Sequence, residues 1–187
     1  YRPLGIGIIN FAYFLAKNGV SYSDPKALAL VDEYAEAWSY YLIKASADLA
    51  VEQGPCTKWE NLKYADGRLP IDTHKMEVDE LVPHVERMDW DGLRSQILKS
   101  GIRNATLMAL MPAETSAQIS NATNGIEAPR SYVSIKQSKH GVLKQVVPEF
   151  ERLKGNYELL WDQKSPEGYL KICSVLQKYI DQGISIN

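Results

Sequence analysis

The sequence predicts a mixed α/β fold, and three patterns indicate this class. An apolar helical stripe extends over about thirty residues before Gly54-Pro55. A short, nearly continuous apolar run occupies Ala105–Met111, and two β-rich runs flank residues 138–141. Apolar runs of this length between helices are typical of buried strands in a parallel sheet. With 187 residues, of which 45% are hydrophobic, the chain is long enough to bury a sizeable core.

The first half of the chain contains two predicted helices. The run Ile8–Leu15 has helical apolar spacing and ends at Asn18-Gly19. In the second helix we expect Asp24 to be the N-cap and Pro25 to occupy the first helical position. The stripe expected to face the core of this long helix consists of Val31, Ala35, Trp38, Leu42, Ala45 and Leu49.

Irregular structure is expected from residue 56 to about residue 88, with turns at Asp66-Gly67 and Leu69-Pro70. Asp89 is expected to cap a short helix that Gly101 closes. The run Ala105–Met111 is expected to be a buried strand, although periodicity alone leaves a buried helix open.

The last third of the chain combines strands and one helix. The runs Ser131–Lys136 and Val142–Val147 predict a hairpin. A final helix is expected over roughly Glu167 to Gln182, with Ile172, Val175, Leu176 and Tyr179 facing inward. After it, residues 184–186 are expected to begin another strand.

Composition excludes several classes of function. The formal net charge of -2 argues against a general nucleic-acid surface, which usually needs a basic face. No apolar run approaches the ~18 residues of a membrane span. From the charge and the missing span together, we expect no direct DNA or membrane binding. The start at Tyr1 has neither an initiator Met nor a signal peptide, which leads us to expect a cytoplasmic piece of a longer polypeptide.

Metal and thiol chemistry are not indicated by residue spacing. Cys56 and Cys173 belong to no CxxC or Cys/His cluster and are expected to be structural. His74, His84 and His140 have no partners at metal-ligand spacing, and we expect all three to be solvated. The spacing therefore indicates no metal site and no local redox motif within this chain.

A candidate ligand site follows the predicted strand. Pro112 turns the chain, and Thr115 and Ser116 are expected to open a short helix. In α/β proteins, ligands bind where strands end and helices start, and the unpaired amides of a first helical turn favour an anion. Pro112, Ala113, Glu114, Thr115 and Ser116 are therefore candidate phosphate-binding residues.

A simpler interpretation stays open for the same residues. Thr or Ser after a strand is more often a helix cap, which contributes about 1 kcal/mol, and Glu114 commonly complements a helix dipole. The Gly-Lys pair of a Walker A loop is missing. Asn121, Asn124 and Glu127 could line the pocket, but Asn and Gly before Pro129 also favour a simple turn.

Three blocks of sequence resemble class I ribonucleotide reductase large (alpha) subunits of the bacterial or bacteriophage type. They are LGIGIINFAYFLAKNG (residues 4–19), RNATLMALMPAETSAQISNATNGIEAPR (103–130) and YVSIKQSKHGVLKQVVPEF (132–150). The resemblance covers essentially the whole chain, including LQKYIDQGISIN at 176–187. It implies that residues 1–187 are one incomplete segment, the C-terminal part of a ten-stranded α/β barrel.

The resemblance also implies a function. In that family, the loop that matches residues 112–116 holds the phosphates of a ribonucleoside diphosphate that is reduced to a deoxyribonucleotide. The radical cysteine and the redox cysteine pair lie upstream of the matched region. We therefore expect the chain to contribute no catalytic residue, to be inactive alone and to need the N-terminal part of the large subunit. A metal-containing small subunit would supply the radical, and a thioredoxin or glutaredoxin-type protein would supply electrons, with no cofactor in this chain.

Two other functions compete with this one. The chain could be a noncatalytic interaction or assembly module derived from that subunit. It could also be a separate phosphate-binding α/β protein without radical chemistry.

Overall fold

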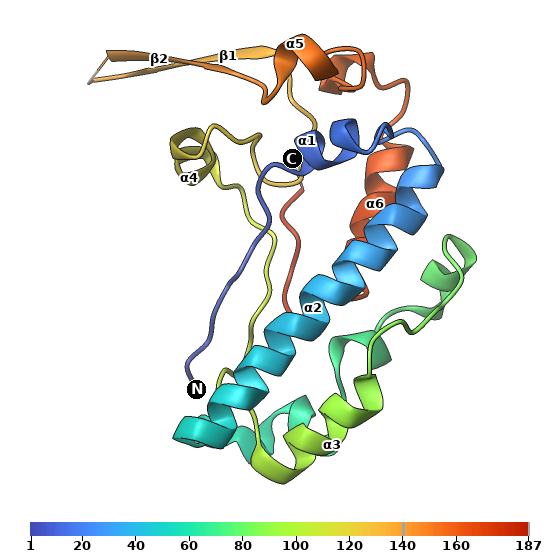
Figure 1. Ribbon diagram of the computed structural model, residues 1–187, viewed down its shortest axis with the longest axis vertical. Helices are drawn as coiled ribbons and strands as arrows, with labels where there is room; N and C mark the ends of the chain where they lie inside the picture. Colours follow the sequence, from blue (N-terminus) through green and yellow to red (C-terminus); the bar gives the residue numbers. More distant parts are fainter. Residues whose placement is uncertain (140, 187) are drawn as a thin grey trace. The chain divides into compact units, whose positions relative to one another are not determined.

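The structure, a computed structural model, describes residues 1–139 and 141–186. These residues fall into two compact units (Figure 1). Unit 1 combines residues 1–6, 28–109 and 171–184, and unit 2 combines residues 7–27, 110–170 and 185 onward. Each unit is therefore assembled from segments that lie far apart in the sequence. His140, one of the three histidines, lies outside the described residues.

Helices dominate the described residues, which contain a single two-stranded sheet. The α-helices are α1 (Phe11–Lys17), α2 (Lys26–Gln53), α3 (Trp90–Ser100), α4 (Glu114–Ile119), α5 (Phe150–Leu153) and α6 (Glu167–Gln177). Short 3-10 helices are η1 (Trp59–Asn61), η2 (Lys63–Asp66), η3 (Pro70–Asp72), η4 (Met76–Glu80) and η5 (Leu160–Asp162). The strands are β1 (Val133–Ser138) and β2 (Gly141–Val146). In the described part of the chain, no helix combines the length and apolarity needed to cross a membrane.

The ends of α2 agree with the prediction. The side chain of Asp24 accepts a hydrogen bond from the Lys26 amide at 2.9 Å, which satisfies one free donor of the first turn. The helix extends over 28 residues to Gln53, where Gly54 takes a left-handed conformation with φ +79°. Both boundaries depend on local residues, which explains why the sequence predicts them.

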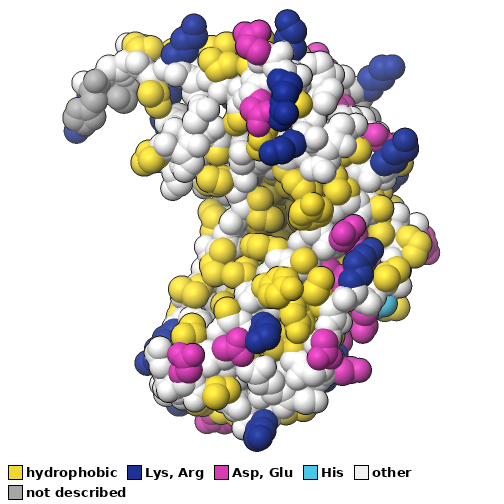
Figure 2. All heavy atoms as spheres, viewed as in Figure 1, with side chains coloured by type: hydrophobic (Ala, Val, Ile, Leu, Met, Phe, Trp, Pro, Cys, Tyr) yellow, Lys and Arg dark blue, Asp and Glu magenta, His cyan; other side chains and the backbone are white. Residues whose placement is uncertain are grey.

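The predicted buried stripe of α2 is only partly correct. Val31 and Ala35 are buried, but Ala45 and Leu49 are exposed. The buried face instead includes Ile43 and Ala47 together with the polar residues Asp32, Glu36, Ser39 and Ser46. Tyr34 and Tyr41 of α2 are exposed. Figure 2 shows many hydrophobic side chains on the face that it draws. Polar residues replace apolar ones on the inner face because each finds a hydrogen-bond partner there.

Helix α3 lies beside α2 in unit 1 (Figure 1). Asp89 caps α3 as predicted, since its side chain accepts a hydrogen bond from the Gly92 amide at 2.9 Å, and Gly101 ends the helix. The buried Trp90 ring meets Tyr40 of α2 edge to face, with 5.3 Å between ring centroids. This contact holds the start of α3 against the middle of α2.

The run Ala105–Met111 is extended, and an isolated parallel bridge joins Met108 to Ile6. Backbone hydrogen bonds from Leu4 to Thr106 and from Ile6 to Leu107 continue the pairing. Leu107 and Met108 are buried, as expected for an inner strand. The alternative of a buried helix is therefore wrong for this segment.

Helix α1 begins three residues later than the apolar run suggested. Asn10 adopts a left-handed conformation with φ 67°, and its backbone N–H bonds to the Thr123 carbonyl at 2.9 Å. Ile8 therefore stays outside the helix, while Phe11, Ala12 and Leu15 face the core of unit 2.

Strands β1 and β2 pair antiparallel, with Val133 opposite Val146 and Ser138 opposite Gly141. Helix α6 starts at Glu167 but ends at Gln177 rather than near Gln182. Backbone bonds from Lys178 to Val175 and from Tyr179 to Leu176 tighten the chain into i→i−3 turns at this point. The inward-facing residues predicted for this segment, Ile172, Val175, Leu176 and Tyr179, are all buried.

Candidate functional site

The five residues predicted to contact a phosphate lie on one continuous segment of unit 2, at the start of α4. Ala113 is the N-cap and makes no side-chain cap, so the helix starts at Glu114. Thr115 and Ser116 follow within the first turn and are exposed. Because neither hydroxyl residue occupies the cap position, the helix-cap interpretation of Thr115 and Ser116 is wrong.

The backbone amides of this turn differ in what they bind. The Ala113 amide donates to the Asn124 side-chain oxygen at 2.9 Å. Among the residues that the structure describes, no acceptor faces the amides of Glu114, Thr115 or Ser116. These three donors lie on exposed residues at the positive end of the helix. The turn can therefore donate several hydrogen bonds to an anion.

The segment that follows α4 is hydrogen-bonded to the first residue of α1 and to Asn10, the residue that precedes α1. The side-chain oxygen of Asn10 accepts from the Thr123 amide at 3.0 Å, and the Phe11 amide donates to Gly125 at 3.3 Å. Gly125 has φ +50°, and a Cβ there would lie 3.3 Å from the Met111 carbonyl oxygen. This close approach lets Asn124 reach back to Ala113.

Asn121, Asn124 and Glu127 mainly shape the chain. Asn121 adopts a left-handed conformation with φ 50°, which Asn tolerates better than most residues. Asn124 binds Ala113 through its oxygen and donates through Nδ2 to Glu127 at 3.2 Å. The role of Asn124 in holding the turn was not predicted, although the Asn-Gly pair at 124–125 marked a tight turn.

One cation lies next to the start of α4. The Lys136 ammonium group, on β1, is 3.2 Å from the Glu114 carboxylate. Both side chains are largely exposed, so the pair contributes little to stability. Lys136 offsets the negative charge that Glu114 places in the turn.

A hollow of about 630 Å³ lies elsewhere on unit 2, along β2 and α5. It includes Asn121, Lys144, Phe150 and Arg152 in its lining, and none of the five predicted residues contributes to it. A phosphate held by backbone donors needs no deep cavity, so the start of α4 can bind an anion without one.

A buried ionic network occupies unit 1. The Arg87 guanidinium donates to Asp32 at 2.9 Å and to Glu36 at 2.8 Å, and both carboxylates are fully buried. Trp90 Nε1 and the Arg87 amide also donate to Glu36, at 3.0 Å and 2.7 Å. Burial raises the pKa of Glu36, but the hydrogen bonds from Arg87, Trp90 and Met88 outweigh it and hold that pKa below its ordinary value.

The network extends to the end of α6. The Tyr179 hydroxyl donates to Asp32 at 2.7 Å, and burial together with this carboxylate raises the pKa of Tyr179 far above its ordinary value. Asp32 and Glu36 are fully buried and accept hydrogen bonds from Arg87, Trp90 and Tyr179, which indicates a structural role. No sequence pattern indicates this network, because its members come from three distant segments.

Both cysteines and two of the histidines, His74 and His84, lie among the described residues. Cys56 and Cys173 are buried, as expected for structural cysteines. His74 is not solvated, because its side chain is only 7% exposed and lies against Asp79. His84 is partly exposed, at 36% of its side chain.

Comparison with known proteins extends these observations. The family model described as "Ribonucleotide reductase, barrel domain" matches residues 1–187. The chain is 58% identical over 186 residues to the ribonucleoside-diphosphate reductase subunit alpha of Haemophilus influenzae, and this match covers 100% of the chain and 25% of that protein. The corresponding Escherichia coli subunit is 55% identical, with 100% of the chain and 24% of the relative covered.

A phage protein is also similar. The ribonucleoside-diphosphate reductase subunit alpha of Enterobacteria phage T4 is 42% identical over 188 residues, which cover 100% of the chain and 25% of that protein. The chain thus spans about a quarter of the length of these relatives. The bacterial and bacteriophage resemblance seen in the sequence is confirmed over the whole chain, and the chain belongs to the ribonucleotide reductase barrel domain family.

Proposed function

We propose that this chain supplies the substrate-diphosphate site of a class I ribonucleotide reductase that reduces ribonucleoside diphosphates to deoxyribonucleotides. In this proposal Pro112, Ala113, Glu114, Thr115 and Ser116 form the diphosphate loop. The amides of the first turn of α4 and the two hydroxyl groups are the donors. The chain contributes no catalytic residue and no metal ligand to the reductive step.

One observation carries the proposal. The amides of Glu114, Thr115 and Ser116 have no acceptor among the described residues, and they lie on an exposed turn. Charge-assisted hydrogen bonds from such amides to phosphate oxygens are roughly twice as strong as neutral ones. Lys136 adds a cation beside the turn, which a doubly charged phosphate group would favour.

The remaining parts of the enzyme follow from the family. We propose that the chain forms several strands of a ten-stranded α/β barrel and is inactive without the N-terminal part of the alpha subunit. That part would carry the radical and redox cysteines. The small subunit would generate the radical with its metal centre, and a thioredoxin or glutaredoxin-type protein would act as reductant in the cytoplasm.

The loop can be tested by removing its hydroxyl groups. In the complete alpha subunit assembled with its small subunit, Thr115→Val combined with Ser116→Ala is expected to raise KM for a ribonucleoside diphosphate about tenfold. This corresponds to about 1.4 kcal/mol, the contribution of one or two hydrogen bonds to a charged group. Thr115→Val keeps the β-branched shape, so the helix itself should change little.

The matched control is Ser120→Ala, which removes a hydroxyl at the opposite end of α4. It should leave KM unchanged. If the double variant lowers thermal stability but not substrate affinity, the diphosphate assignment is wrong. Equal effects of the double variant and the control would count against it as well.

A further inference from the structure

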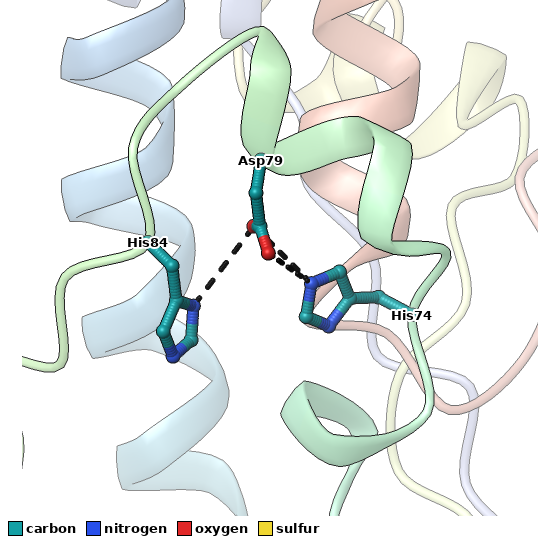
Figure 3. Close-up of side chains that lie close together, drawn as sticks. All are labelled: His74, Asp79 and His84. Atoms are coloured by element: carbon teal, nitrogen blue, oxygen red, sulfur yellow. Dashed lines mark hydrogen bonds and ion pairs between the residues drawn. The ribbon is translucent and has the colours of Figure 1, made fainter.

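Two histidines and one aspartate meet in unit 1, in the irregular segment between η3 and α3. His74 follows η3, Asp79 belongs to η4, and His84 lies a few residues beyond that helix. One possible ligand atom from each residue lies within 4.8 Å of the other two. Figure 3 shows both imidazole rings turned toward the carboxylate of Asp79. The spacing along the sequence gives no sign of this cluster.

The hydrogen bonds of His74 fix where its proton lies. Nδ1 is 2.7 Å from the Ile71 carbonyl oxygen, which can only accept, so Nδ1 carries the hydrogen. Nε2 lies 3.2 Å from both oxygens of Asp79. In the neutral ring Nε2 is also an acceptor, so two acceptors face each other. A positive species between them, either a proton or a metal ion, removes that conflict.

His84 has a related arrangement. Its Nε2 is 3.2 Å from the Glu86 carboxylate, and its Nδ1 is 4.0 Å from Asp79 Oδ1. When Nε2 donates to Glu86, the lone pair of Nδ1 points toward Asp79. Both rings therefore have one nitrogen held by an oxygen acceptor and the other nitrogen directed at the same carboxylate.

We propose that His74 Nε2, His84 Nδ1 and Asp79 bind a divalent transition-metal ion of the zinc type. Two imidazole nitrogens and one carboxylate, completed by water, are a common donor set for zinc. Metal-ligating histidines usually donate their second N–H to a carbonyl or carboxylate. The Ile71 carbonyl and Glu86 occupy those positions here.

The surroundings of the cluster are compatible with an ion. Lys178 donates to Asp79 Oδ1 at 3.0 Å, which leaves Oδ2 for the metal. Asp79 and Glu86 provide two negative charges against the single ammonium of Lys178. In a tetrahedral zinc site, ligand atoms lie about 3.4 Å apart, so the ligands have to move closer on binding. His84 is partly exposed and lies in a loop, which makes this movement possible.

Binding would fix the segment between η3 and α3. The three ligands lie at intervals of five residues, so one ion would close two loops of a region without α-helix or strand. An ion that binds the folded protein and not the unfolded chain raises thermal stability. This inference concerns unit 1 alone and does not depend on the diphosphate proposal.

The test is metal titration of the purified protein after treatment with EDTA and desalting. We expect uptake of one equivalent of Zn²⁺ by calorimetry, a higher Tm with Zn²⁺, and visible d–d bands of four-coordinate geometry with Co²⁺. His84→Gln should weaken zinc binding by about 10- to 100-fold or more, because it removes a ligand outright. Its circular dichroism spectrum should stay unchanged, since His84 is partly exposed.

Glu77→Gln is the matched control, because it removes an exposed carboxylate from the same 3-10 helix without touching a ligand. It should bind zinc like the parent protein. Two results would overturn the proposal: no stoichiometric binding by the parent protein, or equal binding by the parent and His84→Gln. An NMR spectrum with both His74 nitrogens protonated and no response to Zn²⁺ would assign the cluster to a simple imidazolium–carboxylate pair.

Discussion

Asn124 shows how a residue outside the proposed loop can control the loop. Its oxygen accepts from the Ala113 amide, and the neighbouring Gly125 allows the close approach that this bond requires. The sequence predicted where the loop begins, because Pro112 and the hydroxyl pair mark a strand-to-helix turn. It could not predict that Asn124, eleven positions after Ala113, binds the Ala113 amide. That bond depends on the position of the segment around Thr123, which Asn10 holds by a hydrogen bond.

Removing this side chain is expected to weaken the loop. Asn124→Ala leaves the Ala113 amide without its acceptor, which costs about 1 kcal/mol of stability. We expect KM for the ribonucleoside diphosphate to rise in the assembled enzyme while kcat changes less, because the loop binds substrate and performs no chemistry. Steady-state kinetics measures both constants. Asn121→Gly, which keeps the left-handed backbone position, is the control and should leave KM unchanged.

For the helices, the ends of α2 can be predicted from local sequence, but its buried face cannot. Its ends follow from Asp24 and Gly54, which act within one turn of the chain. Its buried face does not follow from hydropathy, because Asp32 and Glu36 are buried by partners from residue 87 and from the end of α6. Helix α6 illustrates the same limit, because it ends at Gln177 and the turns after it lead to Tyr179, which reaches the network.

The buried network predicts a stability change that depends on pH. Glu36→Gln removes the charge that Arg87 neutralises, and breaking such a buried pair is expected to cost about 3 kcal/mol at pH 7. Because the folded-state pKa of Glu36 is lowered, its stabilisation is present above about pH 4.5 and disappears as the pH falls through the folded-state value. Urea unfolding at pH 7 and pH 3 measures both effects.

The difference between parent and variant should therefore shrink in acid. Glu33→Gln is the matched control, since Glu33 lies on the same helix and is exposed. It should change the free energy of unfolding by less than about 0.5 kcal/mol. A Glu36→Gln penalty of the same size at both pH values would contradict the assigned ionic role.

At the scale of the whole molecule, the two units draw on segments from both halves of the chain. Residues 1–6 pair with the segment around Met108, and Asp181 accepts from the amides of Leu107 and Met108 at 2.8 Å. The sequence predicted an extended buried segment here from its apolar residues. It could not predict the Asp181 contacts, because a carboxylate near the end of a helix is usually solvated.

The proposed dependence on the rest of the alpha subunit can be tested by recombination. Neither this chain nor the N-terminal part should reduce a ribonucleoside diphosphate alone, even with the small subunit and a reductant. The mixture of both parts should restore deoxyribonucleotide formation, because the radical cysteine and the diphosphate loop then belong to one assembly. No gain over either part would favour a noncatalytic module.

A crystal structure of the assembled enzyme with a bound ribonucleoside diphosphate would test the diphosphate loop directly. We predict phosphate oxygens within about 2.7–3.2 Å of the amide nitrogens of Glu114, Thr115 and Ser116. A diphosphate bound elsewhere, with these three amides facing water or protein acceptors, would show that residues 112–116 are not the diphosphate loop.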